Sequence, residues 1–176
     1  RTDVALSCKA LARLTNLSGH RFPTGYADGR RAWLEVTLLD ADNRETVVSG
    51  AYDTAEAHLD TADMQLRVYE SLQGRTGMGH EEHIALHDMV LKDTRIPPKG
   101  YRPLAGHEPV GVDYAGGANG ALRHWDDAQY TFSIPANARG PVTVRVRVRY
   151  QTTTREYVDF LARENRTDDR GRELQR

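Results

Sequence analysis

The sequence predicts an all-β fold in which antiparallel strands form two packed sheets. Short segments alternate between apolar and polar residues, turns rich in glycine and proline separate them, and helical periodicity occurs in one segment near the C-terminal end. This combination is typical of a β-sandwich. The chain has 176 residues, which fits one domain with room for a hydrophobic core.

The first expected strand ends at about Leu14. Its apolar positions fall on one face and comprise Val4, Leu6, Cys8, Ala10, Ala12 and Leu14. We interpret Cys8, the single cysteine, as a small core residue, and one cysteine excludes a disulfide within the chain. A turn-rich loop follows, in which Pro23 fixes one backbone torsion and Gly25 and Gly29 permit turns.

The middle of the chain is expected to contain shorter strands and more loop. The strands are expected over residues 32–39, 45–49 and 65–71. The polar residues 53–63 indicate a loop, and residues 83–91 have a mixed pattern. Pro97 and Pro98 exclude a central strand where they lie, and residues 101–124 indicate one long loop.

The clearest strand pattern lies late in the chain, after a strand around residues 130–134. The residues expected to face the core are Val142, Val144, Val146, Val148 and Tyr150. Arg145, Arg147 and Arg149 are expected to face outward as a positive ladder, because residues two apart on a strand share a face.

A short helix is expected over about residues 154–164. Thr153 and Glu156 match a capping box, and the apolar residues on one helical face are Tyr157, Val158, Phe160 and Leu161. We therefore predict an antiparallel immunoglobulin-like β-sandwich over residues 1–166, with this C-terminal α-helix covering one end. Residues 167–176 are expected to form a charged tail or linker.

Four blocks of sequence carry a resemblance to a known family. They are NLSGHRFPTGYADGRRAWLEV from Asn16, SGAYD from Ser49, GHEEHIALHDMVLKDTRIPPKGY from Gly79 and YQTTTREYVDFLARENRTDDRG from Tyr150. In this order they resemble the β-sandwich domain at the C-terminal end of bacterial multiheme c-type cytochromes. The chain contains no Cys-x-x-Cys-His motif, so it cannot itself attach haem c covalently.

The resemblance implies a haem-free domain or subunit of an electron-transfer assembly. Its partner would be a haem-bearing cytochrome region or subunit that holds the haem c, in the periplasm or outside the cell. The chain has no signal-peptide pattern, so this localisation follows from the resemblance alone.

Two histidines are candidate axial ligands of a haem on the neighbouring polypeptide. They are His20, in the turn-rich loop, and His83, because a neutral imidazole binds haem iron well. The alternative for His20 is a structural histidine that bonds to backbone. Arg145 and Arg147 are candidate contacts for haem propionates or for an acidic partner, since guanidinium groups suit carboxylates.

A metal site is the alternative for the second histidine group. On a helix, the spacing of His80, His83 and His87 would place all three on one face, as zinc or nickel requires, whereas on a strand only His83 and His87 would share a face. Asp40 and Asp42 resemble half a calcium loop, but the glycine and distal glutamate of that motif are misplaced, and a turn explains them better.

Composition and motifs exclude several function classes. The net charge of -1 gives no overall attraction to nucleic acid or anionic membrane, and no apolar run approaches the roughly 20 residues that cross a bilayer. Hydrolase and phosphate-binding motifs do not occur, so we do not expect an enzyme. A structural or assembly module, including a self-assembling one, is the alternative to a redox role, and its sign would be an apolar patch or an open sheet edge.

Overall fold

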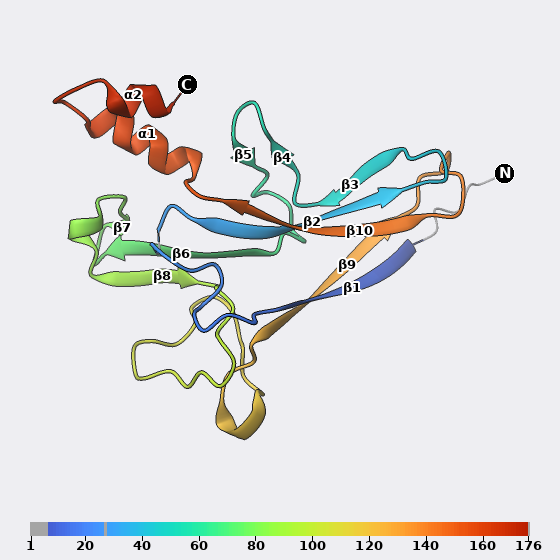
Figure 1. Ribbon diagram of the computed structural model, residues 1–176, viewed down its shortest axis with the longest axis horizontal. Helices are drawn as coiled ribbons and strands as arrows, with labels where there is room; N and C mark the ends of the chain where they lie inside the picture. The colour runs from blue at the N-terminus through green and yellow to red at the C-terminus, as the bar shows by residue number, and fades with distance from the viewer. Residues whose placement is uncertain (1–6, 27, 176) are drawn as a thin grey trace.

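The computed structural model describes residues 7–26 and 28–175. It confirms the prediction of an all-β fold of antiparallel strands with little helix (Figure 1). In chain order the elements are β1 (Ser7–Thr15), β2 (Arg31–Leu39), β3 (Glu45–Ser49), β4 (Tyr52–Asp53), β5 (His58–Leu59), β6 (Val68–Arg75), β7 (Gly79–His80), η1 (Ile84–Leu86), β8 (Met89–Asp93), η2 (Ala118–Gly120), β9 (Trp125–Ser133), β10 (Thr143–Gln151), α1 (Arg155–Glu164) and α2 (Arg170–Leu174), where η denotes a short 3-10 helix.

Two sheets of unequal size make up the fold, together with a small hairpin. The smaller sheet pairs β1 with β9 along their whole length. In the larger sheet, β2 pairs with β10 on one edge and with β3 and β6 on the other, and β6 continues to β7 and β8. The β4–β5 hairpin begins at Tyr52 and otherwise lies within residues 53–63, which the sequence indicated as a loop.

The hydrophobic core lies between these two sheets. Its buried members are Ala32, Leu34 and Val36 of β2, Tyr69 of β6, Ala128 and Tyr130 of β9, and Ile96 and Tyr114 of the loops. On β1 burial alternates as expected, and Cys8 is half-buried, while Val4 and Leu6 lie outside the described residues. Residues 101–124 form the expected long loop, which contains η2 and one isolated β-bridge, between Val110 and Asp93.

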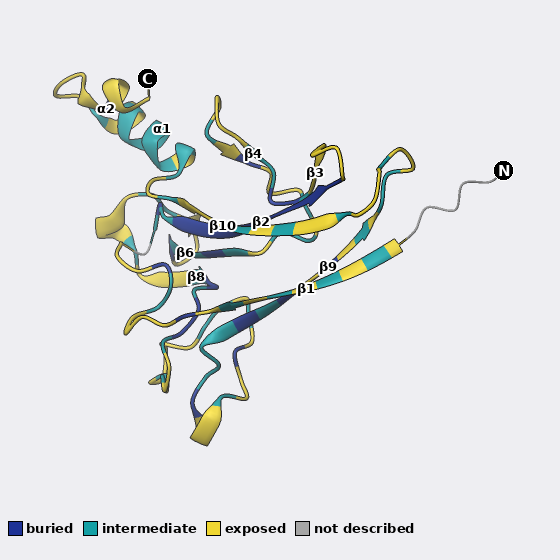
Figure 2. Cartoon of the chain, turned by 45° about the vertical axis from the view of Figure 1, so that its right-hand side comes forward, coloured by how far each residue is buried: buried dark blue, intermediate teal, exposed yellow. Residues whose placement is uncertain are grey.

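All nine residues of β2 are buried, although alternation predicts only one buried face (Figure 2). The second face is covered by side chains rather than by a sheet. Trp33 packs against Tyr52 of β4 with ring centroids 5.1 Å apart, and its Nε1 donates to the Gly50 carbonyl at 3.2 Å. Glu35 is covered by arginines that extend from β10.

The valine face of β10 is the main correction to the sequence analysis. Four of its residues were expected in the core, namely Val144, Val146, Val148 and Tyr150. The exposed fraction of each is instead between 37% and 50%. Their partners on β2 are Leu38, Val36, Leu34 and Ala32, which are at most 3% exposed, so the valines lie on the core side of the sheet. In the part of the chain that the structure describes, the opposing sheet consists of β1 and β9, and it leaves this face of the edge strand β10 exposed.

The arginine face of β10 forms ion pairs across the sheet. Arg147 Nη1 lies 2.8 Å from Glu35 Oε1, and Arg149 Nη2 lies 2.8 Å from Glu35 Oε2. Burial alone would raise the pKa of Glu35, but the hydrogen bonds from both arginines outweigh it and hold that pKa below its ordinary value. Glu35 therefore stays ionised and ties β10 to β2 at neutral pH.

We expect this carboxylate to make stability depend on pH in the acid range. Because the pKa of Glu35 is lower in the folded than in the unfolded state, its contribution is complete above the unfolded value of about 4.3 and is lost as the pH falls through the folded value. Glu35→Gln should be less stable at pH 7 and should lose less stability on acidification. Urea unfolding at several pH values measures this, with the exposed Glu56→Gln as control. Equal acid slopes for wild type and Glu35→Gln would contradict the expectation.

The C-terminal segment differs from expectation at both of its ends. The helix cap is Thr154 rather than Thr153, and its Oγ1 accepts a hydrogen bond from the Tyr157 N–H at 3.3 Å. The expected tail contains the helix α2, in which Gly171 is buried. A Cβ at Gly171 would lie 2.8 Å from the Cα of Ala162, so the absence of a side chain lets α2 pack closely on α1.

Candidate functional site: the His20 loop

Residues 16–26, which we call the His20 loop, follow β1 directly and form most of the connection to β2. Asn16 is 4% exposed. Its Nδ2 donates to the carbonyls of His20 at 2.7 Å and of Ile96 at 2.9 Å, and its Oδ1 accepts from the Ser18 N–H at 2.9 Å. One buried amide therefore closes the turn before His20 and ties it to the strand end at Ile96.

Arg21 anchors the loop on the other side of His20. Its guanidinium pairs with Asp93, donates to the Tyr101 hydroxyl at 2.9 Å and contacts the carbonyl of His107. Asp93 is 3% exposed and also accepts from Arg95, at 2.8 Å and 2.7 Å. Asp93 therefore ties the end of β8 to the His20 loop, with Arg21 as its partner from that loop.

Phe22 fixes the next position through its backbone. Its N–H donates to the Ile96 carbonyl and its carbonyl accepts from the Ile96 N–H, both at 2.9 Å. The Phe22 ring packs at the edge of the core, 6.5 Å from the ring of Tyr69, and Pro23 is buried. The residues that follow His20 are therefore held by a two-bond bridge and by the core.

His20 itself is exposed between these anchors. Its backbone accepts the hydrogen bond from Asn16, but its ring makes no hydrogen bond or ion pair with the described residues. Leu17, in the same turn, is 90% exposed. The arrangement presents a free imidazole next to an apolar side chain on a backbone that is fixed on both sides, which suits a ligand to a metal centre on another molecule.

The residues that hold this histidine were not among those predicted from the sequence. Asn16 and Ser18 form an Asx turn. The sequence signal for this turn is the Asn-x-Ser spacing, which is also the acceptor pattern for N-glycosylation. The pairing of Arg21 with Asp93 spans 72 residues. A single sequence contains no local signal for such a contact.

The structure separates the three histidines of the second group, because residues 80–87 do not form an α-helix. His80 Nε2 and His87 Nε2 lie 3.4 Å and 4.0 Å from Asp28 Oδ2. The His83 ring instead lies edge-on to Phe160, with centroids 6.3 Å apart. Within residues 7–26 and 28–175, no group of three His, Cys, Asp or Glu side chains is arranged to hold a metal ion.

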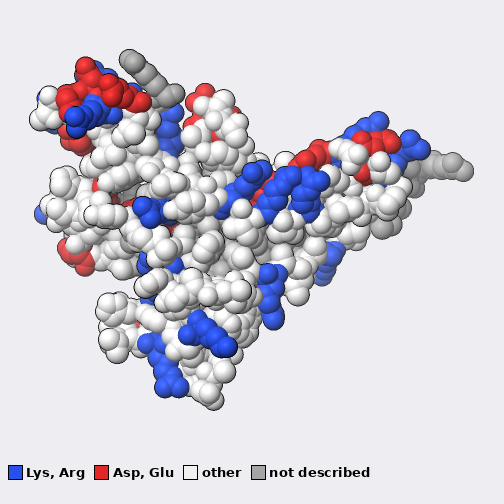
Figure 3. All heavy atoms as spheres, in the orientation of Figure 1, with Lys and Arg blue, Asp and Glu red and all other residues white. Residues whose placement is uncertain are grey.

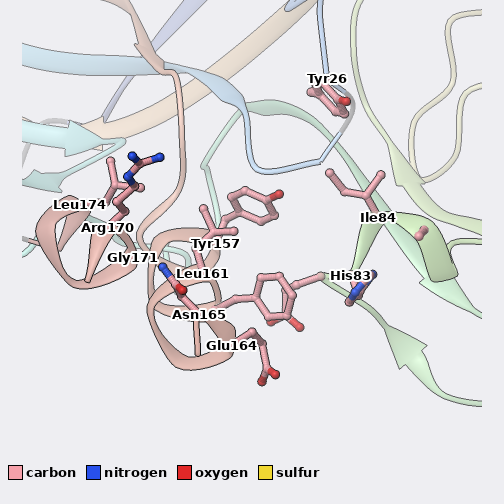
Figure 4. A pocket seen from close by; sticks show the side chains of 13 residues that line it. Tyr26, His83, Ile84, Tyr157, Leu161, Glu164, Asn165, Arg170, Gly171 and Leu174 are labelled. Carbon is pink, nitrogen blue, oxygen red and sulfur yellow. The ribbon is translucent and has the colours of Figure 1, made fainter. Parts of the chain in front are cut away.

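His83 borders a largely apolar pocket of about 690 Å³ between α1, α2 and the segment around η1 (Figure 4). Tyr157, Phe160 and Leu161 of α1 form one wall, and Tyr26 and Ile84 lie across from it. The His83 ring is at the rim of this pocket. Its surroundings therefore differ from those of His80 and His87, which lie near Asp28.

The other candidate residues are engaged within the chain. Arg145 and Arg147 contact Glu45 at 3.6 Å and 3.3 Å, so the expected positive ladder is interleaved with acidic groups (Figure 3). Asp40 accepts from the N–H groups of Asp42 at 2.8 Å and Arg44 at 2.9 Å, as expected of a turn rather than a calcium loop.

Comparison with known proteins finds no relative of this chain. No protein-family model matches the chain, and neither a curated protein nor a solved structure matches it. In the part of the chain that the structure describes, no helix combines the length and the apolar character needed to cross a membrane.

Proposed function

We propose that this chain is a haem-free domain or subunit of a multiheme c-type cytochrome assembly, and that His20 is an axial ligand to a haem held by neighbouring polypeptide. The observation that supports this role is the exposed His20 ring, free of partners among the described residues, on a loop whose backbone is fixed by Asn16, Arg21 and Phe22. The four sequence blocks that resemble the cytochrome domain point to the same role.

The chain itself would supply a ligand to the haem iron and would shield the haem edge from water. Haem c supplies the redox chemistry when it is held by the partner, and the imidazole nitrogen of His20 would occupy one axial position of its iron. Since the loop is ordered beforehand, little conformational entropy is lost on ligation. The exposed Leu17 would cover part of the haem edge, and reduced exposure to water shifts a haem potential.

The finer architecture and the setting belong to the same proposal. An immunoglobulin-like sandwich is supported by two antiparallel sheets that share one core. A periplasmic or extracellular location rests on the resemblance alone. The second candidate function is a redox-free assembly module, and the exposed valine face of β10 at a sheet edge favours it.

A haem peptide tests the role of His20 directly. The purified chain is titrated with a c-type haem peptide whose iron carries one histidine and has an open sixth position, and ligation is followed as conversion of the ferric haem spectrum to the low-spin form. We expect His20→Ala to weaken binding by at least about tenfold, which corresponds to about 1.4 kcal/mol.

His58→Ala is the matched control, because His58 is also exposed but lies on β5, away from the His20 loop in the sequence. It should bind the haem peptide like the wild type. Both substitutions remove exposed rings, so far-UV circular dichroism and the urea midpoint should not change. Equal affinity of His20→Ala and wild type, or equal losses for both variants, would count against the proposal.

A further inference from the structure

The outer edge of β10 has no partner strand among the described residues. Thr143–Gln151 pair with β2 on one side, and β10 is the terminal strand of its sheet. Residues 143–150 make no other backbone hydrogen bond to the part of the chain that the structure describes. In an edge strand, alternate N–H and C=O groups point outward, so β10 offers a template for one more strand.

One face of this edge is apolar and exposed. Val146 and Val148 are 41% and 46% exposed, and Tyr150 is 50% exposed. Their cross-strand neighbours on β2 are buried, so these side chains extend the core face of the sheet past its last strand. A strand added beside β10 would place its own apolar side chains next to them.

The other face of the edge is basic. Arg145, Arg147 and Arg149 are 36–47% exposed along their side chains, and the three of them share two carboxylates, Glu35 and Glu45. The three arginines and the two glutamates together therefore carry one net positive charge. Acidic side chains on an added strand would lie opposite these arginines and complement that charge.

A second copy of the chain does not fit this edge. In an antiparallel pair of β10 strands centred on Arg147, that residue faces its own copy and Arg145 faces Arg149. A shift by two residues again places arginine opposite arginine, and a shift by one turns valines toward arginines. Like charges directly opposite each other destabilise a sheet, so the edge disfavours self-pairing.

We propose that β10 is the docking edge for an extended segment of a partner polypeptide in which acidic residues alternate with apolar residues. The segment adds a strand to the sheet, with main-chain hydrogen bonds along the edge, apolar contacts to the valines and ion pairs with the arginines. Docking at β10 does not involve His20, and it would occur in a redox assembly and in a redox-free assembly alike.

Two synthetic peptides test the pairing. One fluorescently labelled peptide alternates glutamate and valine, and its matched control alternates lysine and valine. By fluorescence anisotropy at low salt, the full chain should bind the glutamate peptide at least about tenfold more tightly than the lysine peptide. The difference should shrink as salt is added, because exposed ion pairs are screened.

A variant pair locates the contact on β10. Val146→Asn replaces an exposed apolar residue of β10 and should weaken binding of the glutamate peptide by about tenfold. Val47→Asn makes the same change on β3, where Val47 is 51% exposed, and should leave binding unchanged. Unchanged urea midpoints for both variants separate a binding effect from unfolding.

Several outcomes would overturn the inference. These are no binding of the glutamate peptide at about 1 mM, equal binding of the two peptides, or equal losses in Val146→Asn and Val47→Asn. A concentration-dependent dimer in sedimentation experiments that Val146→Asn abolishes would also overturn it, because the occupant would then be a second copy of the chain.

Discussion

Replacing Asp93 with alanine is expected to lower the free energy of unfolding by about 3–5 kcal/mol. Asp93 is buried and accepts hydrogen bonds from Arg21 and Arg95, whose side chains are only 17% and 16% exposed. The substitution leaves two guanidinium groups without their shared partner in a poorly hydrated place. Urea unfolding followed by tryptophan fluorescence measures the loss.

The exposed pair of Arg13 and Asp127 provides the control for Asp93. It has comparable hydrogen bonds, at 2.6 Å and 2.7 Å, but the arginine side chain is 58% exposed. Water replaces the lost partner in Asp127→Ala, so the effect should be much smaller. If Asp93→Ala and Asp127→Ala were equally destabilising, burial would not be the source of the effect.

Replacing Tyr69 with alanine is expected to cost about 3–5 kcal/mol. Tyr69 is 2% exposed in the core, where it contacts Phe22 of the His20 loop and donates to Asp126 Oδ2 at 2.9 Å. Burial raises the pKa of Tyr69 well above its ordinary value, so its hydroxyl remains a donor at neutral pH. The alanine variant loses both the ring and the hydrogen bond.

Tyr69→Phe separates these two contributions. It keeps the ring and removes the donor of a mostly buried carboxylate, so it should cost about 1–3 kcal/mol, less than the alanine variant. Tyr26→Ala is the surface control, since Tyr26 is 67% exposed, and it should change stability little. A phenylalanine variant as unstable as the alanine variant would show that the hydrogen bond, and not packing, dominates at this position.

Alternation in the sequence identified most strands because a period of two residues is a local property. The same period contains no information about which residues cover each face of a strand. On β10 it correctly grouped Val144, Val146 and Val148, yet these valines are exposed because the opposing sheet ends before them. On β2 it predicted one buried face, whereas Trp33 and Glu35 are buried by a hairpin and by arginines that are distant in sequence.

The candidate site shows the same division between local and distant information. The turn around His20 was evident from its glycines and proline. The partner of Asp93 across 72 residues had no signal in a single sequence. The spacing of His80, His83 and His87 indicated one shared face only if the segment were an α-helix, and the strand β7 and the short 3-10 helix η1 form there instead.

The strand order has a consequence for how the protein is made. Among the described residues, β1 pairs with β9 alone, and the full-length partner of β2 is β10. Each of these two strands therefore pairs with a strand more than a hundred residues later in the chain. During synthesis, the N-terminal strands leave the ribosome long before their partners exist. Such distant pairing is typical of slow folding, and until β10 is complete one edge of β2, the most buried strand of the finished protein, has no partner strand.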